Sequence, residues 1–250
     1  MAKKAQVKET ETKVYEDYNE FKKDFNYNDP NYAFYYKFIK RPISYPLCWI
    51  VYHTSLTPNT LTIIGAVFAL LAGISLRIGT PLYLIIAAIC FFIFELSDDF
   101  DGVIARSKNM SSKRGGWLDA LVGIFGKSII LAGASIGLYY TTNEPVSLIY
   151  GIVGMFGYFA YNIIDNSIKI HFLTTRFKKL KFAEHAPKPE TLEGKLSIFS
   201  ELIMNLWYVV FFLASIFNVI QVFVIFSAIY YPLYAISQFL YRNHIYSDNN

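Results

Sequence analysis

The strongest constraint on this chain is a series of long apolar stretches separated by short polar or basic loops. A helix needs roughly 20 predominantly apolar residues to cross the hydrocarbon core of a bilayer. Only helices and closed barrels satisfy every backbone hydrogen bond in lipid. The sequence therefore predicts an all-α integral membrane fold with roughly six transmembrane helices. We expect these spans at about residues 59–75, 82–105, 116–140, 146–172, 196–217 and 219–241.

The part of the chain that precedes the first span differs in character. Its first 30 residues are highly charged, and no apolar segment follows their lysines as it would in a signal peptide. Residues 31–54 mix aromatic and basic side chains, a pattern typical of an amphipathic helix in the membrane interface. We expect Pro42 and Pro46 to break that helix. The predicted organisation is a cytosolic tail at 1–30, an interfacial helix at 31–54 and a six-helix transmembrane domain at 55–245.

The basic residues predict how the chain is oriented. Four lie between Arg106 and Arg114, and six lie between Arg176 and Lys195, whereas the alternate loops carry little charge. The positive-inside rule then places both termini and both basic loops in the cytosol. This uneven charge concerns membrane orientation, so no nucleic-acid partner is expected. Cys48 and Cys90 form no Cys-x-x-Cys pair, and we expect neither a zinc site nor a disulfide framework.

Charged residues at the end of the second span are the first candidates for chemistry, because such residues are costly inside a membrane and usually functional. Asp98 and Asp101 lie three positions apart, so they share one helix face and can hold one cation. The small residues Gly102 and Ala105 leave space above that face. Arg106 follows near the cytosolic surface. This face can accommodate a divalent metal ion, a flat nucleotide and a phosphate charge.

The start of the third span carries a matching face. Gly115, Asp119 and Gly123 follow one another at a spacing of four residues, which places them on one side of a helix. A short loop joins the second and third spans, so the ends of these helices meet. Asp119 is therefore predicted to complete a carboxylate cluster with Asp98 and Asp101.

These residues resemble the CDP-alcohol phosphotransferase family, whose signature is D-x2-D-G-x2-A-R-x8-G-x3-D-x3-D. The chain matches it, in order and spacing, at Asp98, Asp101, Gly102, Ala105, Arg106, Gly115 and Asp119. Upstream, the segment from Leu56 to Thr62, which includes Asn59, is similar to the start of the family's first span. The six-helix layout and the interfacial helix before it also fit the resemblance.

The resemblance implies an enzyme of phospholipid biosynthesis that moves a phospho-alcohol unit, of phosphatidyl type, from a CDP-alcohol to an acceptor hydroxyl and releases CMP. It implies that Asp98, Asp101 and Asp119 bind Mg²⁺ or Mn²⁺. It also implies that Asp98, Asp101, Gly102, Ala105, Arg106, Gly115 and Asn59 cradle the CDP group. The expected partners are a CDP-linked lipid alcohol, an acceptor alcohol and membrane lipid, and a homodimer is an open alternative. The active site is expected at the cytosolic face.

The chain departs from the signature at its fourth aspartate, which the family is credited with using as the base and which falls at Gly123. Two other carboxylates are candidates for that role. Glu95 lies one turn deeper than Asp98 on the same helix face. Asp165 lies on a polar stripe of the fourth span. A structural ion pair is an equal alternative for Glu95.

Three function classes stay open at this point. The first is an active transferase with a rearranged base. The second is a catalytically impaired relative that acts as a nucleotide-binding, lipid-binding or regulatory membrane protein. The third is a proton or cation transporter, which would use intramembrane carboxylates without needing Arg106. Metal-dependent CDP binding separates the first two from the third, and CMP release separates the first from the second.

Overall fold

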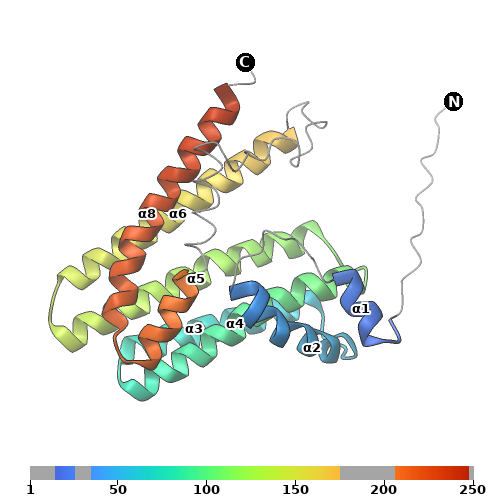
Figure 1. Ribbon diagram of the computed structural model, residues 1–250, viewed down its shortest axis with the longest axis horizontal. Coiled ribbons are helices and arrows are strands. Elements are labelled where there is room, and N and C mark those ends of the chain that lie inside the picture. The colour runs from blue at the N-terminus through green and yellow to red at the C-terminus, as the bar shows by residue number, and fades with distance from the viewer. Residues whose placement is uncertain (1–14, 26–34, 175–205, 248–250) are drawn as a thin grey trace.

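The computed structural model describes residues 15–25, 35–174 and 206–247 of the chain, and every element in these ranges is helical (Figure 1). Two short helices and a π-helical turn come before the apolar part of the chain. The elements are α1 (Tyr18–Phe25), η1 (Tyr36–Lys40), α2 (Arg41–Tyr52), α3 (Pro58–Ile78), α4 (Pro81–Ser107), α5 (Lys113–Thr142), α6 (Val146–Thr174), the short helix Leu206–Ile216 and α8 (Ile220–Ser247).

Five of the described helices are long and apolar enough to cross a membrane, namely α3, α4, α5, α6 and α8. The predicted class, an all-α multi-pass membrane protein, is thereby confirmed. The predicted span at 196–217 is described only from residue 206 onward, where Leu206–Ile216 forms a shorter apolar helix. The predicted count of six is therefore approximate.

The first three spans form a bundle of helices that alternate in direction, in which α3 packs against both α4 and α5. Glycines bring α3 and α5 unusually close. A Cβ atom on Gly133 would collide with the carbonyl group of Gly73, and one on Gly137 would collide with the carbonyl group of Leu76. Small residues at these crossings let two backbones approach, which is a common way to pack helices in lipid. Of the remaining spans, α6 packs mainly on α8 and also contacts α5.

Local signals fix the ends of the helices that carry the site. The Thr57 side chain accepts a hydrogen bond from the Thr60 N–H and caps α3, and Ser112 does the same for Gly115 at the start of α5. At the other end of α3, Gly79 adopts a left-handed conformation with φ 71°. The two capped ends, the starts of α3 and α5, lie at the end of the bundle where α4 finishes.

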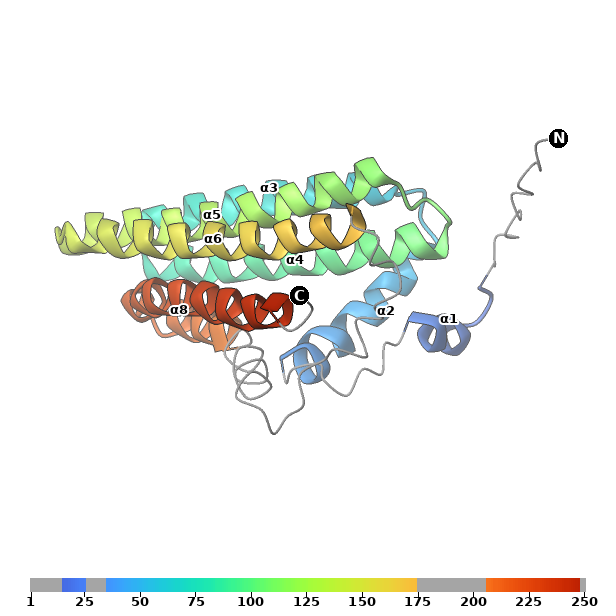
Figure 2. The same cartoon turned by 90° about the horizontal axis from the view of Figure 1, so that it is seen from above.

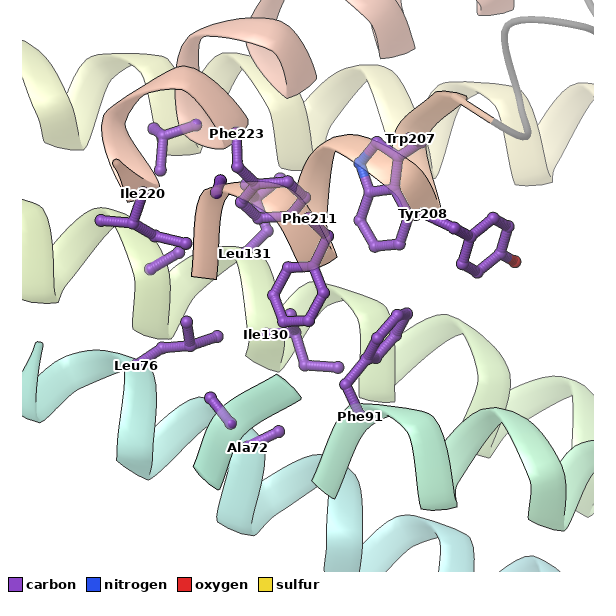
Figure 3. Close-up of a cluster of buried hydrophobic side chains, with 14 of the residues drawn as sticks. Ala72, Leu76, Phe91, Ile130, Leu131, Trp207, Tyr208, Phe211, Ile220 and Phe223 are labelled. Carbon is purple, nitrogen blue, oxygen red and sulfur yellow. The ribbon is translucent and has the colours of Figure 1, made fainter. Parts of the chain in front are cut away.

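A continuous hydrophobic core joins the two groups of spans (Figure 3). Phe91 of α4 contacts the aromatic rings of Trp207 and Phe211, which come from the short helix Leu206–Ile216. Phe223 of α8 packs on the same two rings. The short helix therefore lies between α4 and α8 and holds them together.

The predicted break at Pro42 and Pro46 is wrong, because η1 and α2 form one continuous helix from Tyr36 to Tyr52. Pro42 directly follows the π-helical turn, so its missing N–H falls where the hydrogen-bonding pattern changes from π-helical to α-helical. The wider π-helical turn that precedes it leaves room for the proline ring. Pro46 is tolerated in the interior of α2. This helix packs against α4 and lies oblique to the bundle, near the end where α4 connects to α5 (Figure 2).

Candidate functional site

The three predicted aspartates line one pocket at the end of the bundle formed by α3, α4 and α5. Asp98 and Asp101 come from the last turns of α4, and Asp119 comes from the second turn of α5. The pocket has an empty volume of about 170 Å³. We call it the carboxylate pocket, and its lining consists of Thr62, Gly65, Phe94, Ser97, Asp98, Asp101, Asp119, Val122 and Gly123.

The aspartates differ in exposure and in their neighbours. Asp101 is buried, Asp119 is half-buried and Asp98 is exposed. The carboxyl groups of Asp98 and Asp119 approach each other across the gap between α4 and α5. In the described part of the chain, none of the three forms an ion pair with a basic side chain. The pocket therefore gathers negative charge that the surrounding helices leave uncompensated.

Thr62 is a residue of this pocket that sequence reasoning missed as a site residue. Its hydroxyl lies 2.5 Å from Oδ2 of Asp101 and donates to it in a buried setting. The same hydroxyl is 3.1 Å from the carbonyl oxygen of Pro58, one turn earlier on α3. Thr62 thus fixes the orientation of Asp101 from a third helix. The signal was its place in the segment from Leu56 to Thr62, four residues after Pro58.

The donor set suits a hard cation, although its present arrangement is open. Carboxylate oxygens are the ligands that Mg²⁺ and Mn²⁺ prefer. Among the described residues, however, no three His, Cys, Asp or Glu side chains are arranged so that they could hold a metal ion as they stand. One oxygen of Asp101 is engaged by Thr62. The chemistry of the pocket fits a divalent ion, and its side chains would have to converge to bind one.

The other residues of the signature lie around this pocket. The Arg106 guanidinium folds back over Gly102, where a Cβ atom would meet its Nη1 at 3.4 Å. Gly115 faces Asn59, whose Oδ1 would be 3.2 Å from an added Cβ. The structure therefore places Arg106 on the face of α4 that continues from Asp98, and it brings Asn59 of α3 to the start of α5. Ala105 is half-buried on α4.

Gly123, which we expect at the position of the signature's fourth aspartate, has free space beside it. No heavy atom lies within 4 Å of the position that its Cβ would take, and the residue lines the carboxylate pocket. The Gly123 carbonyl oxygen accepts a hydrogen bond of 3.3 Å from the Tyr158 hydroxyl of α6. A Cβ atom at this position would therefore meet no neighbouring residue.

Glu95 lies apart from the carboxylate pocket, in a second charged cluster. Its Oε2 is 3.5 Å from Nζ of Lys40, and its Oε1 is 3.6 Å from Nζ of Lys127. Lys40 also pairs with Asp99 at 3.0 Å. We call Lys40, Glu95, Asp99 and Lys127 the lysine network. Its geometry matches the alternative of a structural ion pair that the sequence left open for Glu95.

Lys40 is the most deeply placed member of this network, with a side chain that is 0% exposed. Burial alone would lower the pKa of its ammonium group, but the carboxylates of Glu95 and Asp99 raise that pKa well above its usual value. Lys40 therefore stays charged and ties η1 to α4. The other candidate base, Asp165, belongs to α6, but its side chain lies outside the described residues.

Comparison with known proteins identifies a family and two relatives. The family profile of the CDP-alcohol phosphatidyltransferases matches residues 55–230, a range that contains the whole carboxylate pocket. The chain is 25% identical over 122 residues to a bifunctional IPC transferase and DIPP synthase of Thermococcus kodakarensis, which covers 49% of this chain and 24% of that protein. It is 35% identical over 82 residues to an archaetidylinositol phosphate synthase of Pyrococcus horikoshii, covering 33% and 42%. The matches thus span less than half the length of each relative.

Proposed function

The chain belongs to the CDP-alcohol phosphatidyltransferase family, and we propose that it transfers a phosphatidyl-type group from a CDP-linked lipid alcohol to an acceptor hydroxyl. The observation that carries this proposal is the gathering of Asp98, Asp101 and Asp119, from two helices, in one pocket. Uncompensated carboxylates are costly in a membrane and are kept where a cation or substrate needs them. The names of the two relatives, a transferase and a synthase, agree with this reaction class.

The reaction balances as a displacement at phosphorus. The acceptor oxygen forms a bond to the phosphorus that carries the lipid alcohol, and the bond from that phosphorus to the bridging oxygen of the pyrophosphate breaks. CMP leaves with the electron pair of the broken bond. The proton of the acceptor hydroxyl must pass to a base. A divalent ion, when bound, supplies charge neutralisation for the pyrophosphate oxygens.

The residues of the chain divide these tasks. The three aspartates would hold Mg²⁺ or Mn²⁺, since carboxylate oxygens suit such ions. Arg106 lies over Gly102 and can contact a phosphate of the CDP group. Asn59 and Gly115 meet beside the pocket and leave a small surface for the nucleotide. By the charge bias of its loops, the site faces the cytosol, and so do both termini.

A second function deserves a test because of Gly123. The pocket has free space at this position, and Glu95 is held by two lysines outside the pocket. These two observations support a catalytically impaired relative that binds CDP-alcohols and acts as a binding or regulatory membrane protein. Retained CDP binding without CMP release would favour this alternative.

The deciding experiment measures two quantities on the full chain in lipid nanodiscs. One is CDP binding with and without Mn²⁺. The other is CMP release over a panel of CDP-lipids and acceptor alcohols. We expect Asp119→Asn to abolish metal-dependent CDP binding, because it removes the only pocket carboxylate on α5. Glu144→Gln removes an exposed carboxylate between α5 and α6 and is the matched control. A folded Asp119→Asn protein that bound CDP as tightly as the parent would refute the site.

A further inference from the structure

Lys40 is placed unusually for a basic residue on a helix that we expect in the membrane interface. The helix from Tyr36 to Tyr52 turns apolar side chains outward, and Phe38 and Ile50 are 59% and 61% exposed. Lysines on such helices normally extend their charge toward water. The Lys40 side chain is instead 0% exposed and points into the protein. Taking an ammonium group out of water is costly, so its burial here indicates a specific role.

The ammonium group of Lys40 bridges two carboxylates of α4. Its Nζ is 3.0 Å from Oδ1 of Asp99 and 3.5 Å from Oε2 of Glu95. Glu95 and Asp99 are four positions apart, so they lie on the same side of α4. A bridge to two successive turns opposes both the rotation of α4 and its sliding against the neighbouring helix.

The bridged turn is the one that carries two of the pocket carboxylates. Asp98 lies between the two bridged residues, and Asp101 follows two positions after Asp99. Asp98 also acts electrostatically on the Lys40 ammonium group. From α3, the Thr62 hydroxyl donates a hydrogen bond to Asp101. This segment of α4 is therefore held by two separate contacts, one from α3 and one from Lys40.

Repulsion among carboxylates makes such a hold necessary. Residues 95–101 of α4 contain four of them, namely Glu95, Asp98, Asp99 and Asp101. Like charges one turn apart destabilise a helix, and a low dielectric constant strengthens their repulsion. Lys40 pairs with Asp99, and Lys40 and Lys127 both pair with Glu95. Among the described residues, these pairs leave the excess negative charge of the segment on the side chains that line the pocket.

Stability alone does not explain this arrangement. Replacing both partners of a buried ion pair by well-packed apolar side chains is often neutral or stabilising, so helices can dock without such a pair. We propose that Lys40 is a positioning residue of the carboxylate pocket, and that its ammonium group holds α4 so that Asp98 and Asp101 can converge with Asp119 on a divalent ion. The proposal rests on the proposed function, because it takes the pocket to be a metal site. Lys40 acts through α4 and touches neither ion nor substrate.

The test removes the Lys40 ammonium group without changing the net charge of the lysine network. Lys40→Met alone would leave an extra negative charge that itself attracts cations. The double variant Lys40→Met with Asp99→Asn loses one charge of each sign and keeps the pair between Lys127 and Glu95. Lys40→Met with Glu95→Gln is also neutral and keeps Asp99. Both double variants lack the ammonium group, and either one decides the test if the other does not fold.

Binding of Mn²⁺ is measured on the full chain in lipid nanodiscs with CDP present, from the loss of the electron paramagnetic resonance signal of free Mn²⁺. We expect the Mn²⁺ concentration for half-saturation to rise about 10-fold in both double variants, the lower end of the effect of groups that orient metal ligands. The melting temperature of Lys40→Met with Asp99→Asn in EDTA should stay near that of the parent, because both partners of the pair are removed.

Cys48→Ala is the matched control. Cys48 lies on the same helix, is 0% exposed and packs in a cluster with Val103 of α4. Its replacement weakens the packing of this helix on α4 and changes no charge. We expect a lower melting temperature and a Mn²⁺ concentration close to that of the parent. A rise as large as that of the double variants would mean that any loosening of the helix suffices, and it would overturn the role of Lys40.

The remaining outcomes separate this inference from the proposed function. Parent affinity for Mn²⁺ in the double variants, with CMP release intact, would overturn the role of Lys40 and leave the transferase in place. A rise in only one of two folded double variants would assign the effect to the exchanged carboxylate and would also overturn it. A parent chain that binds no Mn²⁺ would refute the metal site and the positioning role together. Weaker Mn²⁺ binding in the double variants, in a chain that releases no CMP, would support Lys40 and refute the transferase.

Discussion

The carboxylate pocket and the lysine network both include residues of α4, where Glu95 lies about one helical turn before Asp98. The charges are balanced in the lysine network and unbalanced in the carboxylate pocket. Asp98 and Asp101 face Asp119 across a pocket, and none of these three forms an ion pair in the described part of the chain. Glu95 is 3% exposed and lies between two lysines at 3.5 and 3.6 Å. The first cluster concentrates like charges beside a cavity, whereas the second is balanced and closed.

This difference distinguishes a ligand-binding site from a charge network that holds helices together. Like charges gathered in a medium of low dielectric constant repel, so the carboxylate pocket costs stability unless a cation enters it. A balanced network can hold helices together without a ligand, and here it joins η1, α4 and α5. Residues of the same chemical type on the same helix can therefore be assigned different roles from the sign of the charges around them.

The largest contrast is expected when one carboxylate in each cluster is replaced by its amide. Asp98→Asn should slow CMP release at least about 100-fold, which is about 3 kcal/mol of barrier, because it removes a pocket ligand. It should leave the melting temperature unchanged or higher, since it relieves repulsion. Glu95→Gln should lower the free energy of unfolding by about 3 to 5 kcal/mol, because it leaves two lysines facing one carboxylate fewer. Thermal unfolding and CMP release measure the two effects.

The same pair decides whether Glu95 is the base. If it is, Glu95→Gln will lose transfer activity per folded molecule while its melting temperature stays near that of the parent. The double variant Glu95→Gln with Lys40→Met restores the charge balance, and it should recover part of the stability lost by the single change. No recovery would mean that Glu95 and Lys40 are not coupled, and the structural role of the network would fail.

A smaller effect is expected at Gly123, where a fourth carboxylate would increase the excess negative charge of the pocket. The Cβ atom that Gly123→Asp adds meets no neighbour within 4 Å, so we expect the helix to accept the change. It adds a negative charge, and the melting temperature should therefore fall in EDTA and recover with Mn²⁺. If the chain lacks a base, CMP release should rise about 10-fold or more.

Gly123→Asn is the matched control for Gly123→Asp, since it has nearly the same size without the charge. A rise in CMP release that Asn reproduces would point to packing instead of proton transfer. An unchanged rate with Gly123→Asp, in a parent that is already active, would mean that the chain has another base.

Local regularities explain what the sequence predicted. The spans follow from apolar length, and the meeting of Asp98, Asp101 and Asp119 follows from helix periodicity and from a short loop between α4 and α5. The lysine network could not be reached in this way, because Lys40 and Glu95 are 55 positions apart and their contact depends on how α2 docks on α4. Lys127 did give a signal, as a lone basic residue inside an apolar span.

Two further features depend on packing that no local pattern carries. The cavity lined by seven tyrosines assembles residues from five segments between Tyr36 and Tyr234. Tyrosines scattered over such a distance look like interfacial residues when only the sequence is read. The continuous helix through Pro42 depends on the π-helical turn before it, which single-residue propensities do not describe. Both features required the positions of neighbouring helices.

The smallest effect concerns Thr62, which differs from the lysines in how it holds its carboxylate. A neutral hydroxyl, donating over 2.5 Å, positions Asp101 in the pocket, where the network would use an ammonium group. Thr62→Val keeps the shape and removes this donor, so the Mn²⁺ concentration for half-maximal CDP binding should rise about 3- to 10-fold. Thr62→Ser keeps the donor and should behave like the parent. If Val and Ser act alike, the hydroxyl does not position Asp101, and the charge of the pocket alone sets its affinity for cations.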